Sequence, residues 1–134
     1  MCTGVPTGCR PATDLRMELP PDARAAGAAR AFVRRHLPEL GFPKLVDNAC
    51  LVAAELTTNA MKYASSHGPI WLSIRLAASR VLLEVEDGSP ELPVLRDPDH
   101  LAESGRGLHV VAAFSAAFNW RRVGDGKIVW ALLE

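Results

Sequence analysis

The sequence predicts an α/β (α+β) two-layer sandwich, in which a mixed and mostly antiparallel sheet packs against three helices. Apolar residues recur every three or four positions, as on one face of a helix, in segments 22–37, 44–63 and 108–115. Period-two alternation, or a short apolar run between turns, is typical of strands and marks segments 15–19, 70–76, 80–87, 117–123 and 127–133. Short turns at 77–79 and 124–126 join two pairs of these strands, which predicts antiparallel hairpins.

The composition is that of one compact domain that recognises its partners locally. Of the 134 residues, 49% are hydrophobic and 22% are charged, and the formal net charge is zero. These values exclude a disordered chain. They show no excess of basic over acidic residues, so we expect no direct binding to nucleic acid. The sequence has no apolar run of about 18 residues and no signal-peptide pattern, so we expect a cytoplasmic protein without a membrane contact.

The domain is expected to span residues 15–134. Residues 1–14 are rich in Gly, Pro and Thr and have no apolar period, which indicates a flexible tail. Strand 15–19 ends at two prolines, which favours an edge position, whereas strand 127–133 is apolar on both faces and should lie inside the sheet. The three cysteines, Cys2, Cys9 and Cys50, lack metal-ligand spacing, so we expect reduced thiols.

The helix predicted over 44–63 carries two polar side chains where its pattern calls for apolar ones. At 100° per residue, Asn59 falls within the apolar face and Glu55 lies at its edge, one turn away. A bound cation with phosphate would satisfy both groups, because burying either of them without a partner costs free energy. The alternative interpretation is a Glu at the helix edge and a core Asn with a hydrogen bond inside the protein.

Asp87 ends the strand 80–87 on the same face as Val81, Leu83 and Val85. An acidic side chain that points toward the buried side of a sheet needs a partner. It is therefore either a turn-capping residue that accepts a nearby backbone N–H, or an acceptor for a ligand.

A long, polar and proline-rich segment, 88–106, separates this strand from the third helix, and segments of this length are often lids or binding loops. It ends in Gly105-Arg106-Gly107-Leu108, and we expect the helix to begin at Leu108. Glycines at a helix start let backbone N–H groups approach an anion, and the helix dipole favours negative charge there. Ordinary turn geometry is the alternative reason for both glycines.

The chain contains, in order, Glu55-x-x-x-Asn59 on a helix, Asp87 at a strand end, a long loop and Gly105-x-Gly107-Leu108. This order resembles the N, G1 and G2 boxes of the Bergerat-fold (GHKL) ATP-binding superfamily, which includes the histidine-kinase-like ATPases. Within that superfamily, the chain is most similar to the anti-sigma-factor serine/threonine kinases. The resemblance implies that three helices cover one face of the sheet and leave the other open. It also implies that ATP binds between the helices and a lid loop.

The resemblance further implies a role for each of these residues in holding ATP and Mg²⁺. Asn59 would be the Mg²⁺ ligand, Glu55 the general base for the attacking hydroxyl, and Asp87 the acceptor for the adenine amino group. Arg106 would add positive charge near the γ-phosphate, with a solvent-facing Arg as the equal alternative. The other ATP-binding positions lie in the glycine boxes, at Gly88, Gly105, Gly107 and Leu108.

The sequence departs from the family pattern in three places. Ser89 and Glu91 stand where the first glycine box commonly has glycines. On the last strand, a hydroxyl residue often lies near the adenine, and Ile128 is expected to occupy that position. There is no room before Leu15 for the helical hairpin that carries a phosphoacceptor, so we expect a separate module rather than a complete histidine kinase.

Two functions remain open from the sequence. The first is a serine/threonine kinase that binds a sigma factor and phosphorylates a serine on a STAS-type anti-anti-sigma factor, and the resemblance also allows a homodimer. The second is a non-catalytic, ATP-sensing interaction module whose lid changes partner affinity with nucleotide state. Glu55 favours the kinase, and the altered glycine box favours the module.

Overall fold

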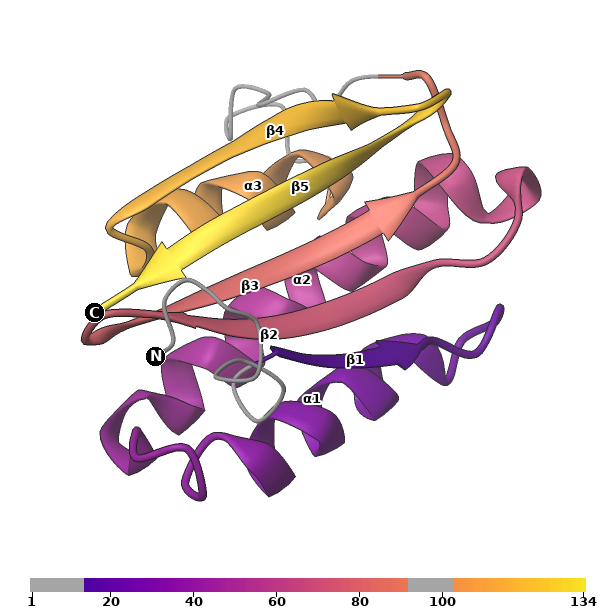
Figure 1. The fold of residues 1–134 in the computed structure, drawn as a ribbon. Helices are drawn as coiled ribbons and strands as arrows, with labels where there is room; N and C mark the ends of the chain where they lie inside the picture. Colours follow the sequence, from indigo (N-terminus) through magenta and orange to yellow (C-terminus); the bar gives the residue numbers. More distant parts are fainter. Residues whose placement is uncertain (1–13, 92–102) are drawn as a thin grey trace.

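The computed structural model describes residues 14–91 and 103–134 (Figure 1). The predicted tail, except for Asp14, and most of the predicted lid loop lie outside these residues. Two 3₁₀ turns, Pro43–Leu45 and Ser65–His67, flank the second helix. In chain order, the helices and strands are β1 (Asp14–Glu18), α1 (Ala25–His36), α2 (Val46–Ala64), β2 (Trp71–Ala77), β3 (Arg80–Asp87), α3 (Glu103–Phe114), β4 (Ala117–Val123) and β5 (Gly126–Leu133).

The predicted α+β fold is confirmed, with one refinement of the sheet. The described strands form a single sheet in the order β1-β2-β3-β5-β4. Every pairing among them is antiparallel, so the mixed character expected from the sequence does not occur in the described strands. As predicted, β1 lies at an edge and β5 is paired on both sides. The β4–β5 turn contains Gly124 with a φ of 58°, a conformation that glycine adopts at little cost.

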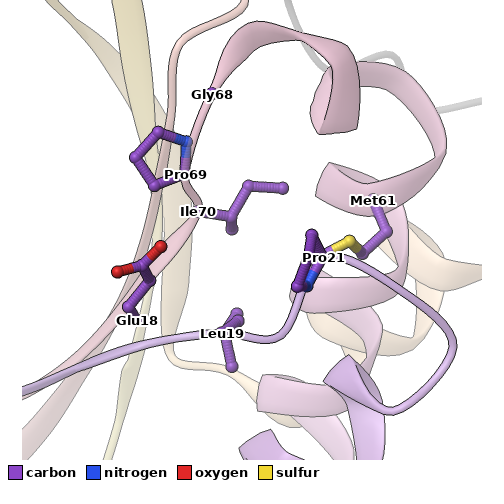
Figure 2. A pocket seen from close by; sticks show the side chains of 7 residues that line it. All are labelled: Glu18, Leu19, Pro21, Met61, Gly68, Pro69 and Ile70. Carbon is purple, nitrogen blue, oxygen red and sulfur yellow. The ribbon is translucent and has the colours of Figure 1, made fainter.

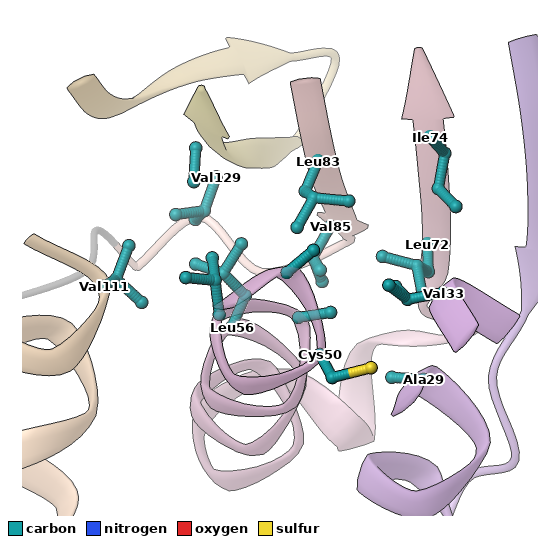
Figure 3. Packing of buried hydrophobic residues seen from close by; sticks show 14 of the residues in the cluster. Ala29, Val33, Cys50, Leu56, Leu72, Ile74, Leu83, Val85, Val111 and Val129 are labelled. Atoms are coloured by element: carbon teal, nitrogen blue, oxygen red, sulfur yellow. The ribbon is translucent and has the colours of Figure 1, made fainter. Parts of the chain in front are cut away.

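The helices form one layer against a single face of the sheet (Figure 1). Figure 3 shows α2 in the middle of this layer, with α1 on one side and α3 on the other. Val33 of α1, Leu56 of α2 and Val111 of α3 all belong to the buried cluster that also includes Val129 of β5. Burying one Leu or Val side chain contributes about 1.5–3 kcal/mol, so this seam stabilises the arrangement of all three helices.

Strand alternation explains which side chains face the helices. Leu72 and Ile74 of β2 lie opposite Val85 and Leu83 of β3, and all four are at most 1% exposed. Their neighbours along each strand point to the other face. The predicted period-two pattern of both strands is therefore confirmed.

In the described part of the chain, no helix covers the opposite face of the sheet. Glu84 of β3 is buried there between Arg75 of β2 and Arg121 of β4, with N–O distances of 3.5 and 3.3 Å. Arg16 of β1 lies over the ring of Trp71, 4.1 Å from its centroid. Charged and aromatic side chains thus cover one another across the strands of this open face.

The third helix begins at Glu103, earlier than the Leu108 start that the sequence pattern predicts. Its C-terminal end leads into β4, where the Ala116 N–H donates to the Leu132 carbonyl near the end of β5. The N-terminal end of α3 therefore points toward the other end of the sheet, where β3 ends and β5 begins (Figure 1). None of the helices within the described ranges has the length and apolar character needed to cross a membrane.

Candidate functional site

Helical geometry directs Glu55 and Asn59 of α2 toward the α3 side of the helix layer. The α1 side is marked by Cys50, whose Sγ donates to the Arg30 carbonyl at 3.5 Å. Burial raises the pKa of this thiol, which keeps it a donor. At 100° per residue, Glu55 and Asn59 lie roughly 140° and 180° around the helix from Cys50. Because α2 lies between α1 and α3 (Figure 3), both polar side chains project toward α3.

Glu55 and Asn59 are half-buried, while the adjacent Leu56 and Ala60 are buried. Across residues 14–91 and 103–134, neither polar side chain makes a hydrogen bond or an ion pair. The alternative interpretation of Asn59 required a hydrogen bond inside the protein, and the described residues provide none. A carboxylate and a carboxamide at the edge of the core are consequently available to a ligand.

Asp87 is buried at the end of β3, with its side chain 1% exposed. Its Oδ1 accepts the Ser89 backbone N–H at 2.9 Å, so the turn-capping interpretation is confirmed. The same oxygen accepts Lys127 Nζ at 3.0 Å, in an ion pair that the sequence pattern did not predict. Both hydrogen bonds use Oδ1, so a turn cap and a ligand contact through Oδ2 are compatible.

Two glycines hold the backbone close around Asp87. A Cβ added at Gly88 would collide with the carbonyl oxygen of His67, and one added at Gly126 would collide with the carbonyl oxygen of Asp87. Only glycine permits such close approach. Gly88, an expected ATP-binding position, therefore also joins the end of β3 to the turn that follows α2.

The altered glycine box forms a compact turn of its own. Ser89 is fully buried, and its Oγ accepts the Glu91 backbone N–H at 3.1 Å. A glycine in place of Ser89 would have no hydroxyl for this bond. The segment after Asp87 is thus held by contacts inside the protein where the family pattern has flexible glycines.

The first turns of α3 lie near the same end of the sheet. Gly105 and Arg106 belong to the first helical turn, and Gly107 and Leu108 to the second. The first turn carries N–H groups without intrahelical acceptors, and the helix dipole favours an anion beside them. Leu108 is 2% exposed, so its side chain is buried, and its backbone N–H lies beyond the first turn, where N–H groups have intrahelical acceptors.

The residue beside Asp87 on the last strand is Lys127 rather than Ile128. The β3–β5 register pairs Asp87 with Lys127 and Glu86 with Ile128. Since successive side chains alternate between faces, Ile128 points to the opposite face from Asp87. Ile128, which was expected beside the proposed adenine site, therefore does not share a face of the sheet with Asp87. Lys127 was missed, because the strand is apolar on both faces and its sequence alone does not show which face meets the helices.

A separate apolar pocket of about 270 Å³ lies on another side of α2 (Figure 2). Met61 of α2 lines it and lies roughly 200° around the helix from Asn59. None of the predicted site residues contributes to this pocket. Its lining consists of Glu18, Leu19, Pro21, Met61, Gly68, Pro69 and Ile70.

Comparison with known proteins supports the fold and identifies the family. The chain resembles the crystal structure of the RsbU and RsbW domains of Rv1364c from Mycobacterium tuberculosis, with 20% sequence identity and a TM-score of 0.67. The match covers 97% of this chain and 33% of the other, so the chain spans a third of that protein's crystallised length and the likeness is one of fold. No curated protein matches the chain in sequence. The family model of the histidine kinase-like ATPase domain matches residues 19–133, and this protein therefore belongs to that family, as its resemblance to the Bergerat-fold superfamily predicts.

Proposed function

We propose that this protein binds ATP with Mg²⁺ and is an anti-sigma-factor serine/threonine kinase. It would bind a sigma factor and phosphorylate a serine on a STAS-type anti-anti-sigma factor. The observation that carries the proposal is the half-buried pair of Glu55 and Asn59, which has no partner among the described residues. Membership in a family of ATPase domains supplies the ligand class. The kinase class and its partners rest on the sequence resemblance, with which the fold shared with the RsbU and RsbW structure is compatible.

The residues present fit Mg-ATP. Mg²⁺ usually binds few protein oxygens and completes its shell with water and phosphate oxygens, so the single carboxamide of Asn59 is a suitable ligand. Asp87 Oδ2 supplies an acceptor for an amino group, and the first turn of α3 supplies N–H groups for phosphate. When bound, Mg²⁺ would neutralise charge on the phosphates.

Glu55 supports the catalytic part of the proposal. A general base must reach the proton that it removes, and its carboxylate must be free to accept that proton. Glu55 lies one turn before Asn59 on the same side of α2, and no cation among the described residues pairs with it. We propose that Glu55 accepts the proton of the attacking serine hydroxyl.

A non-catalytic, ATP-sensing interaction module is the second candidate, and the altered glycine box favours it. Ser89 is buried and its hydroxyl accepts the Glu91 backbone N–H, so the segment after Asp87 is held in place by hydrogen bonds and lacks the freedom of a glycine-rich loop. Such a module would use nucleotide binding to change partner affinity and would transfer no phosphate.

Phosphoryl transfer separates the two candidates. The wild-type chain, Glu55→Gln and Glu39→Gln are each incubated with γ-labelled ATP, Mg²⁺ and every STAS-domain protein of the source organism. Glu39 is an exposed carboxylate outside the site and serves as the matched control. We expect the wild type and Glu39→Gln to label the same STAS protein, and Glu55→Gln to lose at least ~100-fold in rate while it still binds ATP.

ATP binding without label on any STAS protein would exclude the kinase and leave the module. An unchanged rate in Glu55→Gln would remove Glu55 from the mechanism. Failure of the wild type to bind ATP would contradict both candidates.

A further inference from the structure

Lys127 forms a buried ion pair with Asp87. The β3–β5 register makes the two residues direct cross-strand neighbours on the helix-facing side of the sheet. Lys127 Nζ lies 3.0 Å from Asp87 Oδ1, and the side chains are 4% and 1% exposed. A lysine and an aspartate are therefore both buried at the strand ends where the nucleotide is proposed to bind.

Stability alone does not explain this pair. A buried ion pair is usually no more stabilising than a well-packed apolar pair of the same volume, because both charges must leave water. The apolar pairs next to it, Val85 with Val129 and Leu83 with Ala131, show that this face of the sheet accepts such residues. The charged pair consequently points to a role in binding.

The hydrogen bonds of the pair are incomplete. An ammonium group has three N–H donors, and among the described residues Lys127 Nζ finds one acceptor, Asp87 Oδ1. Asp87 Oδ1 also accepts the Ser89 N–H, while Oδ2 accepts no hydrogen bond from the described residues. The pair thus presents a second carboxylate oxygen next to ammonium N–H groups that a ligand could still use.

We propose that Lys127 is a second base-recognition residue, which donates a hydrogen bond to N1 of adenine while Asp87 Oδ2 accepts one from the 6-amino group. This inference rests on the proposed binding of ATP. The pairing edge of adenine carries an amino donor beside a ring-nitrogen acceptor, and this pattern is complementary to the free groups of Asp87 and Lys127. The ion pair stays intact when the base binds, so neither buried charge loses its partner.

The same arrangement selects against guanine. In the adenine orientation, guanine would place its O6 acceptor against the Asp87 carboxylate and its N1–H donor against the Lys127 ammonium. Both contacts are repulsive, and sites that leave buried polar groups unpaired reject a ligand strongly. We expect ATP to bind at least ~100-fold more tightly than GTP.

Calorimetric titration with ATP and 1-deaza-ATP, which lacks the ring nitrogen N1, tests the contact. In the wild type, we expect 1-deaza-ATP to bind at least tenfold more weakly, a difference of about 1.4 kcal/mol. In Lys127→Met, we expect the two nucleotides to bind alike. Lys44→Met, which changes an exposed lysine outside the site, should keep the wild-type ratio.

Because Lys127→Met leaves Asp87 without its counter-charge, the double variant Asp87→Asn, Lys127→Met is measured alongside it. This neutral pair avoids an unpaired buried charge and should also bind both nucleotides alike. Equal binding of ATP and 1-deaza-ATP by the wild type would overturn the inference but leave the proposed function intact. The inference would also fail if Lys127→Met kept the wild-type ratio of the two affinities. Tighter binding of GTP than of ATP would also overturn it. Absence of ATP binding by the wild type would instead contradict the proposed function.

Discussion

Glu55 and Asn59 lie one turn apart on α2 and would perform different tasks. Asn59 offers a neutral oxygen that suits a Mg²⁺ ligand, whereas Glu55 offers a carboxylate that can take a proton. Both are half-buried and have no partner in the part of the chain that the structure describes. Substitution of Asn59 should therefore change Mg²⁺-dependent ATP binding, and substitution of Glu55 should change the rate of phosphoryl transfer.

Asn59→Ala should abolish most of the Mg²⁺ dependence of ATP binding, because it removes the proposed metal ligand. We expect at least a tenfold weaker Kd in Mg²⁺, about 1.4 kcal/mol, and little further change when EDTA replaces Mg²⁺. The measurement is calorimetric titration in both conditions. Asn48→Ala changes an exposed Asn on the same helix and should behave like the wild type. An equal loss in the two variants would argue against a specific role for Asn59.

Sequence periodicity was sufficient to place Glu55 and Asn59 beside the apolar face of α2 and Asp87 on the buried face of β3, because each placement depends only on its own helix or strand. It was not sufficient to find Lys127 as the partner of Asp87. That contact depends on the register between β3 and β5, which are separated along the chain by α3 and β4. The same missing register explains why Ile128, rather than Lys127, was expected beside the proposed adenine site.

Asp22, just before α1, should titrate unusually low. Hydrogen bonds from the Arg24 side chain, and then from its backbone N–H, lower the pKa of the Asp22 carboxyl from 3.8 to about 2. A lowered folded-state pKa stabilises the protein above pH 3.8, and this contribution is lost as the pH falls through about 2. Carboxyl NMR should show a midpoint near 2, and Arg24→Gln should raise it. A wild-type midpoint near 3.8 would contradict the contact.

At the scale of elements, the ends of α2, β3 and β5 are joined by glycine contacts. Gly126→Ala should destabilise the domain by at least about 2 kcal/mol, because its Cβ would collide with the Asp87 backbone. Gly27→Ala, in the exposed part of α1, meets nothing closer than the end of the Arg30 side chain at 4.0 Å and should stabilise by about 0.5–1 kcal/mol. Urea unfolding measures both changes. A Gly126→Ala variant as stable as the wild type would show that the close approach is not required.

The start of α3 illustrates what periodicity cannot predict. Residues 103–107, Glu-Ser-Gly-Arg-Gly, contain no apolar side chain, so the pattern begins only at Leu108. A first helical turn is set by its backbone and its cap rather than by burial of a side chain, and glycine lowers but does not remove helix propensity. The predicted glycine loop is consequently the beginning of the helix.

At the scale of the whole molecule, the face between sheet and helices should carry most of the stability. Leu83→Ala, at a fully buried position on the central strand β3, should cost about 2–5 kcal/mol. This is a large part of the roughly 5–15 kcal/mol available to a domain. Leu51→Ala, 37% exposed on α2, should cost less than about 1 kcal/mol. Thermal and urea unfolding measure both changes. Similar losses of unfolding free energy in Leu83→Ala and Leu51→Ala would contradict this location of the core.

The two-layer fold itself was predictable from the sequence, because amphipathic helices and hairpins can each bury only one side. The order of the strands was not, since the pairing of β1 with β2 and of β3 with β5 joins segments far apart in the chain. The coverage of one face by all three helices came from the family resemblance, and the structure confirms it.

The central claim is that this domain holds ATP through Asp87 at the end of β3. Calorimetric titration of Mg-ATP into the wild type, Asp87→Asn and Asp125→Asn tests it most directly, with Asp125 an exposed aspartate in the β4–β5 turn. The wild type and Asp125→Asn should bind one ATP with equal affinity, and Asp87→Asn should bind at least tenfold more weakly, by about 1.4 kcal/mol. Equal affinity of all three proteins for ATP, or no binding by any of them, would contradict the claim.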